Sequence, residues 1–112
     1  MTEDRVAWPE LASVPVDNII AGLPKAATVV ITESPTYQLG LWKVTPGAFS
    51  SDHTGYAEFI HVIEGSGRLV SEFGTVTELR PGTTSLMPSG WRGRWEIDTP
   101  LTKVFTIIHN PY

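Results

Sequence analysis

Two side chains that could hold a metal ion lie close together in the sequence, at His53 and Glu58. They offer an imidazole nitrogen and a carboxylate oxygen, the donor types that bind manganese, iron, zinc or nickel. A catalytic metal usually takes three protein ligands and keeps one position open, and no third ligand is evident nearby. Two interpretations follow: a reduced metal site, or a loop histidine near a buried carboxylate. We expect the second, with no resident metal.

Glu58 is also the candidate catalytic residue. It begins an apolar run, residues 58–63, that we expect to form a central strand buried on both faces. Burial of an unpaired carboxylate is costly, so the group should be neutralised or paired. It could act as a general acid or base, or it could only hydrogen-bond a neighbour. Strand alternation places His61 on the opposite face, outside this site.

Four further residues are candidates for a ligand pocket: Trp42, Trp95, Lys103 and Phe105. The aromatic residues could line a cavity or fill a small barrel, since both have similar sequence signatures, and packing is the default interpretation. Lys103 could meet an anionic ligand, pair with Glu58 or extend into solvent. His109 has no partner at a revealing spacing and is given no role.

Other chemistries find little support in the sequence. Residues 50–53 contain the residue types of a catalytic triad, but neighbours on one extended segment cannot line up as nucleophile, base and orienting group. No glycine-rich loop precedes a helix, so nucleotide binding is not expected. The basic residues are scattered and the net charge is −4, which argues against nucleic acid as a partner.

The elements that must position these residues are short β-strands. From residue 27 onward, β-prone runs alternate with turn signals, a pattern typical of an all-β sandwich or barrel. We expect strands near residues 27–33, 37–45, 57–64, 67–73, 75–79, 83–88, 93–98 and 102–109. In residues 92–97 the alternation directs Trp95 and Ile97 inward. Residues 1–26 form an N-terminal arm with one helical turn near 17–21, and residues 27–112 form the barrel.

Length and composition limit the chain to one ordinary globular core. It has 112 residues, of which 41% are hydrophobic and 18% charged. It contains no cysteine, no apolar stretch of membrane-spanning length and no apolar run near its start that would indicate a secretory signal. We therefore expect a cytoplasmic protein without membrane contact.

Two segments resemble the paired motifs of the cupin superfamily. Residues 47–65, GAFSSDHTGYAEFIHVIEG, match the first motif at Gly47, His53, Glu58 and Gly65. Residues 82–95, GTTSLMPSGWRGRW, match the second motif at Gly82, Pro88 and Gly90. The resemblance implies a single cupin barrel, the RmlC-like jelly roll, preceded by the arm. It also implies a homodimer, with the arm covering or crossing to the neighbouring subunit.

The chain departs from these motifs at two usual metal ligands. Gly55 and Gly93 stand where histidines are normally found. The lone Glu58 and the ending GWRGRWEIDTPLTKVF resemble a small branch similar to the (S)-ureidoglycine aminohydrolase cupin domain, which often carries a basic residue where this chain has Lys103. The missing ligands and the single barrel argue against transferring that reaction. We expect the bulk of Trp95 to occupy the space of the absent histidine.

Three functional hypotheses result, and the sequence leaves open whether the protein is an enzyme. The first is a cupin that binds a small polar metabolite in its barrel, with Glu58 and His53 or Lys103 facing the ligand. The second is an enzyme with a reduced His53 and Glu58 metal site. The third is a non-catalytic dimeric module whose barrel is packed around Trp42 and Trp95.

Overall fold

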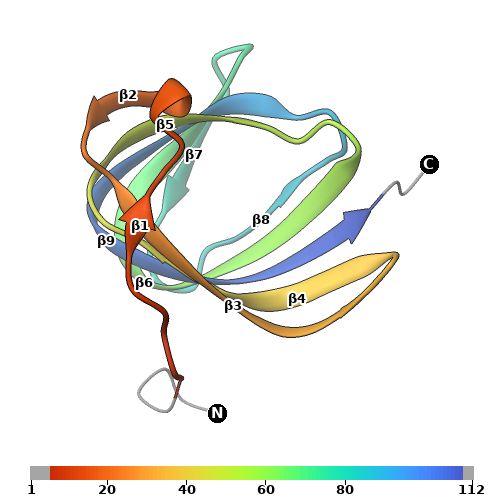
Figure 1. The fold of residues 1–112 in the computed structure, drawn as a ribbon. Coiled ribbons are helices and arrows are strands. Elements are labelled where there is room, and N and C mark those ends of the chain that lie inside the picture. The colour runs from red at the N-terminus through yellow and green to blue at the C-terminus, as the bar shows by residue number, and fades with distance from the viewer. Residues whose placement is uncertain (1–5, 110–112) are drawn as a thin grey trace.

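The computed structural model describes residues 6–109, and within them the strands form one strongly curled sheet (Figure 1). The elements in chain order are β1 (Ala12–Ser13), the 3₁₀ turn η2 (Val16–Asn18), β2 (Ile19–Gly22), β3 (Lys25–Ser34), β4 (Tyr37–Val44), β5 (Gly47–Asp52), β6 (Tyr56–Ser71), β7 (Val76–Leu79), β8 (Thr84–Met87) and β9 (Arg92–His109). The all-β prediction is confirmed. In this part of the chain no helix is long and apolar enough to cross a membrane.

Two long strands, β6 and β9, run antiparallel beside each other and are shared by both halves of the barrel. The first half of β6 also pairs with β8, while the second half of β9 pairs with β4 and, through it, β3. The second half of β6 pairs with β7, and the first half of β9 pairs with β5 and, through it, β2. This is the two-sided arrangement of a jelly roll, as predicted.

Within the predicted barrel, the strand boundaries differ from the sequence expectation in two respects. The predicted pairs 57–64 with 67–73 and 93–98 with 102–109 are two continuous strands, because register shifts between Val62 and Gly67 let β6 bend without ending. Strand β5 was not expected, since its residues Ser50, Ser51 and Asp52 have low β propensity. Pairing with β9 on one side and β2 on the other outweighs that preference.

The chain before residue 27 contributes strands to the same sheet. Strand β1 pairs with β3, and β2 pairs with β5. The turn η2 lies at the start of the stretch where we expected a helical turn. Lys43 of β4 places its ammonium 4.5 Å from the ring centroid of Trp8, which ties the arm to the barrel wall. The ends of the predicted arm and barrel, residues 1–5 and 110–112, lie outside the described residues.

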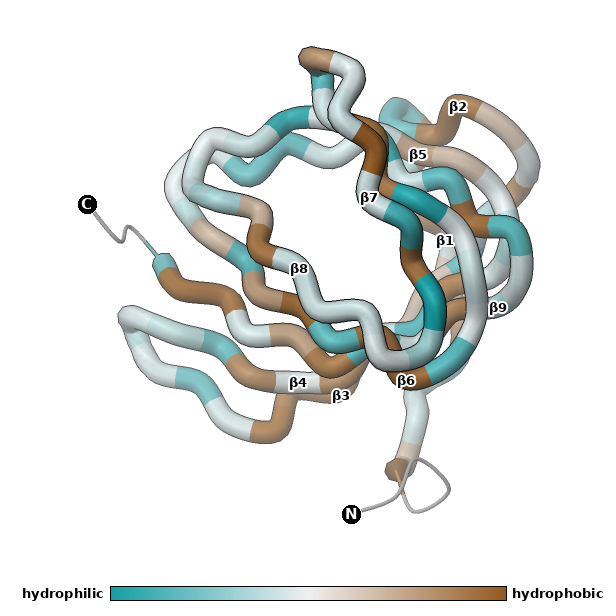
Figure 2. The backbone as a smooth tube through the Cα atoms, turned by 180° about the vertical axis from the view of Figure 1, so that it is seen from behind, coloured by the Kyte–Doolittle hydropathy of each residue, from teal (hydrophilic) through white to brown (hydrophobic). Residues whose placement is uncertain are grey.

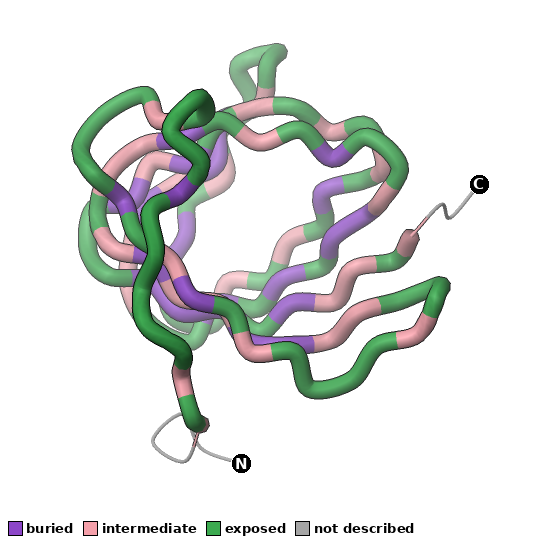
Figure 3. The backbone as a smooth tube through the Cα atoms, in the orientation of Figure 1, coloured by how far each residue is buried: buried purple, intermediate pink, exposed green. Residues whose placement is uncertain are grey.

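Most of the buried apolar residues form one core cluster. Along much of the strands, hydrophobic residues alternate with hydrophilic ones (Figure 2), and buried residues alternate with exposed ones (Figure 3). Trp95 and Ile97 point inward, as the alternation predicted, with 2% and 5% of their surface exposed. The expectation that β6 is buried on both faces is wrong. Ile60 is fully buried, whereas its neighbour Phe59 is 48% exposed. The outer face of β6 therefore carries apolar side chains on the surface.

Candidate functional site

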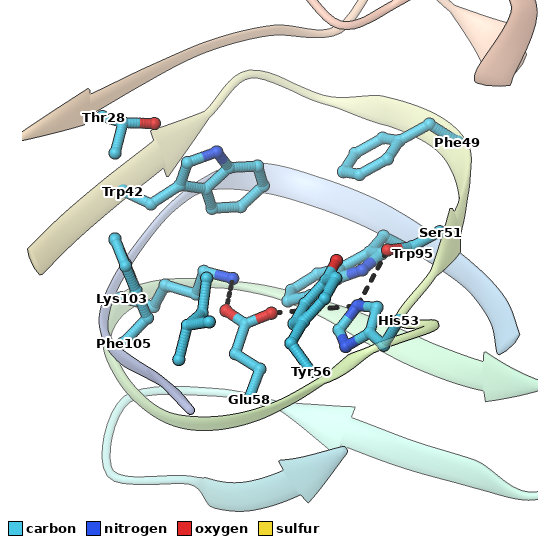
Figure 4. A pocket seen from close by; sticks show the side chains of 11 residues that line it. Thr28, Trp42, Phe49, Ser51, His53, Tyr56, Glu58, Trp95, Lys103 and Phe105 are labelled. Atoms are coloured by element: carbon cyan, nitrogen blue, oxygen red, sulfur yellow. Dashed lines mark hydrogen bonds and ion pairs between the residues drawn. The ribbon is translucent and has the colours of Figure 1, made fainter. Parts of the chain in front are cut away.

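One pocket in the barrel has a volume of about 220 Å³ and is lined largely by aromatic rings (Figure 4). Its lining consists of Thr28, Trp42, Phe49, Ser51, His53, Tyr56, Glu58, Trp95, Lys103, Phe105 and Ile107. All six residues named from the sequence as candidate metal, catalytic or pocket residues lie in this wall: His53, Glu58, Trp42, Trp95, Lys103 and Phe105. The aromatic residues thus line a cavity instead of filling the barrel completely.

Sequence reasoning missed five lining residues: Thr28, Phe49, Ser51, Tyr56 and Ile107. Two of them, Phe49 and Ser51, lie on the unexpected strand β5. Phe49 and Ser51 alternate inward along β5, and His53 continues the same face beyond its end. Tyr56 opens β6 and stacks on His53, with ring centroids 4.7 Å apart. Recognising residues 47–52 as a strand would have predicted the inward positions of Phe49 and Ser51, because alternation fixes them.

Glu58 and Lys103 form a buried ion pair on the pocket wall. Lys103 Nζ donates to Glu58 Oε2 over 2.5 Å, and the side chains are only 6% and 8% exposed. Of the three alternatives for Lys103, the structure shows the pairing with Glu58. The two residues are not directly opposite in the β6–β9 ladder, since Glu58 faces Ile107 and Lys103 faces Val62. Their contact depends on both side chains extending along the interior.

Aromatic faces surround the ammonium of Lys103 on its other sides. Its Nζ lies 4.3 Å from the ring centroid of Trp95, 4.5 Å from that of Trp42 and 5.9 Å from that of Phe105. These distances are within cation–π range. Burial lowers the pKa of Lys103, while the negative charge and hydrogen bond of Glu58 act in the opposite direction. The ion pair is thus largely shielded from solvent.

His53 is 1% exposed, although it lies in the turn that follows β5. Its Nε2 is within hydrogen-bond distance of Ser51 Oγ, 2.9 Å, and is 3.8 Å from Glu58 Oε1. Its Nδ1 is buried and has no hydrogen-bond partner. Burial lowers the pKa of His53, outweighing the opposing effect of Glu58, so the ring is neutral at pH 7.

The contact between Ser51 and His53 does not create a hydrolase triad. A triad needs the carboxylate on the ring nitrogen opposite to the one that faces the serine. Here Ser51 and Glu58 both lie on the Nε2 side of the His53 ring. Asp52, the neighbouring carboxylate in the sequence, instead accepts hydrogen bonds from Thr54 on the exterior. We expected these neighbours not to converge at all. The serine and histidine do meet, but the exclusion of triad chemistry stands.

The donor set does not fit a metal ion. Within residues 6–109, no group of three histidine, cysteine, aspartate or glutamate side chains could hold one. A side chain at Gly93 would place its Cβ 2.3 Å from the carbonyl oxygen of Val70 and 2.7 Å from the Trp91 ring. Gly55 has a backbone φ of 88°, which residues with a Cβ rarely adopt. Trp91, not Trp95 as we expected, occupies the space at position 93.

The remaining histidines play no part in the pocket. His61 lies on the outer face of β6, as the alternation predicted, and is exposed there, contrary to the expected burial on both faces. His109 ends β9 opposite Tyr56 in the ladder and is not among the lining residues. The pocket therefore contains one anion, one cation and one neutral imidazole among its ionisable groups near the centre: Glu58, Lys103 and His53. Their formal charges cancel. Such a site can offer both a hydrogen-bond donor and an acceptor without a net charge.

The jelly-roll fold and the pocket inside its barrel define a protein of the cupin class. Comparison with protein families makes this specific: the family of EutQ-like cupin domains matches residues 32–105, and the chain belongs to that family. No curated protein matches the chain significantly.

Solved structures share the fold at low sequence identity. The chain is similar to the EutQ protein of Clostridium difficile, with a TM-score of 0.68 and 15% identity over 80% of this chain and 66% of that one. A DUF861-family protein of unknown function from Pseudomonas syringae pv. tomato gives a TM-score of 0.81 and 21% identity, over 94% of this chain and 46% of that one. Ectoine synthase from P. lautus gives a TM-score of 0.68 and 15% identity, over 83% of this chain and 69% of that one. The chain thus spans less than half of the Pseudomonas protein.

Proposed function

We propose that this cupin barrel binds a small, uncharged or zwitterionic polar molecule in the pocket around Glu58 and Lys103, without a metal ion. The observation that carries the proposal is the position of this ion pair on a cavity wall. A buried ion pair is weak evidence for a stabilising role, because the loss of hydration offsets much of its attraction. A charged pair beside a cavity is instead typical of a site that recognises a ligand.

The size and walls of the cavity indicate the kind of ligand. Its volume of about 220 Å³ corresponds to on the order of seven water molecules at their liquid density. Trp42, Phe49 and Trp95 present ring faces and edges that suit a flat or apolar part of a molecule. The ligand is therefore a small metabolite, held by its apolar body against these rings.

The charge balance of the site favours a ligand without net charge. An oxygen acceptor on the ligand would face the ammonium of Lys103, and a donor would face Glu58 Oε1, whose neighbour Oε2 already accepts from Lys103. An extra net charge would have no counter-charge in a site whose charged side chains are buried. The remaining sequence hypotheses are less well supported, since the cavity disfavours a packed barrel and the donor set disfavours a metal enzyme.

The test is a panel of small molecules of matched size, grouped as uncharged, zwitterionic, anionic and cationic, measured on chelator-treated protein by thermal shift and calorimetry. A specific ligand at about 100 times its Kd raises the free energy of unfolding by about 2.7 kcal/mol. We expect hits in the first two groups that weaken at least about tenfold in Glu58→Gln and persist in Glu96→Gln on the exterior. Hits that survive Glu58→Gln, or that need added metal, would refute the proposal.

The ureidoglycine-type branch and the homodimer stay predictions. The outer faces of β6, β8 and β9 expose apolar side chains, including Phe59, Leu86 and Ile108 at 48%, 59% and 44%. Apolar surface of this kind is typical of contacts between proteins. Light scattering of the purified protein measures its mass in solution. A dimer that Phe59→Glu converts to monomers would support pairing through this face, and a wild-type monomer would contradict it.

A further inference from the structure

The ionisable groups of the pocket contain a cation that belongs to the chain itself. We infer that the ammonium of Lys103 takes the place that a divalent metal ion would need beside Glu58 and His53, keeps such ions out, and serves as the positive anchor for a ligand oxygen. The last part rests on the proposed function, whereas the exclusion of metal ions does not. The ammonium of Lys103 is a positive charge fixed to the chain, whereas a metal ion would be a positive charge that can dissociate.

The carboxylate available to a metal is already engaged. Glu58 Oε2 accepts from Lys103 over 2.5 Å, and Oε1 lies 3.8 Å from His53 Nε2. A metal ion bound to Glu58 and His53 would therefore lie within a few ångströms of the ammonium. Like charges at such a distance repel strongly where little water screens them. Glu58 and His53 are residue types that can ligate a metal ion, but here they are too few to hold one, and the ammonium beside them repels a cation.

Lys103 cannot easily move aside to admit a metal. Its side chain is 6% exposed, and the rings of Trp42, Trp95 and Phe105 surround the ammonium at cation–π distances. If the lysine left the pocket, Glu58 would remain as a buried charge without a partner, which is costly. The aromatic faces thus hold the lysine in place much as additional protein ligands hold a metal.

The absence of further ligands at two positions agrees with this exchange. A histidine at position 93 would collide with the Val70 carbonyl and the Trp91 ring, and position 55 has a positive φ that disfavours one. Because Lys103 supplies the positive charge beside Glu58, no metal ion is needed to balance that carboxylate, and so no further metal ligands are needed. The same ammonium can then donate to a carbonyl, carboxyl or hydroxyl oxygen of the ligand, the role that a Lewis acid has in metal sites.

The experiment titrates the full chain, purified without an affinity tag, with Zn²⁺ and with Mn²⁺ against a chromophoric chelator and by calorimetry. Wild type should bind neither at this site. Lys103→Met removes the charge and keeps the length of the side chain, and Lys103→Gln serves if the first variant folds poorly. We expect the affinity for Zn²⁺ to rise at least about a hundredfold in either variant, since the nearby repulsion is gone.

The gain must depend on the proposed ligands. Adding Glu58→Gln or His53→Gln to the lysine variant should abolish it, and Lys43→Met on the barrel exterior should show no gain. Stoichiometric metal binding by wild type that is lost in Glu58→Gln would overturn the inference. So would folded lysine variants that bind no more tightly than wild type. A failed ligand panel would instead count against the proposed function and leave the metal result standing.

Discussion

Ion pairs link β6 to β9 on both sides of the barrel wall: one pair lies inside the barrel, and Arg68 pairs with Glu96 and Asp98 outside it. The inner pair, Glu58 with Lys103, has side chains that are 8% and 6% exposed. The outer pair, Arg68 with Glu96, is 3.0 Å long and has side chains that are 29% and 28% exposed. The outer residues are also directly opposite in the ladder, whereas the inner ones are not. The same two strands therefore hold opposite charges together in two very different settings.

The difference shows how water decides what an ion pair does. The outer pair belongs to a network in which Arg68 also bonds Asp98 and Glu96 also bonds Arg94, and solvent and salt screen it. These contacts lower the pKa of Glu96, mainly through the hydrogen bonds of Arg94 and Arg68. The inner pair has lost its hydration and has only its partner and the rings around it. Removing one member should therefore have unequal consequences at the two sites.

The largest effect is expected for Lys103→Met. It leaves Glu58 buried without a partner, which lowers the free energy of unfolding by about 3–5 kcal/mol. Urea denaturation followed by tryptophan fluorescence measures this change. The double variant Glu58→Leu with Lys103→Met removes both charges and should recover most of the loss, because no unpaired charge remains. A double variant as unstable as the single one would show that packing, and not charge, causes the effect.

The next effect concerns pH and the neutral imidazole beside the inner pair. Because the pKa of His53 is lowered from 6.5 in the folded state, the unfolded chain takes up a proton first as the pH falls. The free energy of unfolding should therefore decrease below pH 6.5, by at most about 1.4 kcal/mol per pH unit from this group. His53→Gln should flatten the dependence of the free energy of unfolding on pH between pH 7.5 and 5.5, about one unit on either side of 6.5.

His61→Gln is the matched control for this pH dependence, since His61 is exposed on the outer face of β6. It removes one imidazole without altering the pocket. Equal curves for wild type and His53→Gln would show that His53 accepts a proton as readily in the folded protein as in the unfolded chain. That result would contradict the buried, neutral imidazole on which the charge balance of the pocket depends.

Much of the fold could be predicted because local patterns carry it. The alternation in residues 92–97 placed Trp95 inward, and the glycine-bounded motifs indicated the barrel. Strand β5 could not be predicted in the same way, since Ser50, Ser51 and Asp52 become a strand only through pairing with β9 and β2. The burial of β6 was overestimated because apolar residues such as Phe59 also occur on surfaces.

The residue types of the site were evident in the sequence, but their contacts were not. Glu58 was expected to need a partner, and Lys103 was one of several possibilities. Their pairing depends on two side chains reaching along the interior from positions that are not opposite in the ladder. The Trp91 ring lies where a histidine side chain at position 93 would otherwise be. Its position depends on the path of a turn, which no periodicity in the sequence predicts. Three-dimensional proximity, and not residue type, was the missing information.

The smallest effect is expected for Arg68→Gln in the outer pair. Its loss should change the free energy of unfolding far less than Lys103→Met, because water solvates Glu96 when its partner is removed. The small difference from wild type should shrink further at about 1 M salt, where screening acts over about 3 Å. The deficit of Lys103→Met should persist at that salt concentration, since ions do not reach the buried carboxylate. Urea denaturation at low and high salt compares the two variants, and a deficit of Lys103→Met that salt also removes would mean that solvent reaches both pairs alike.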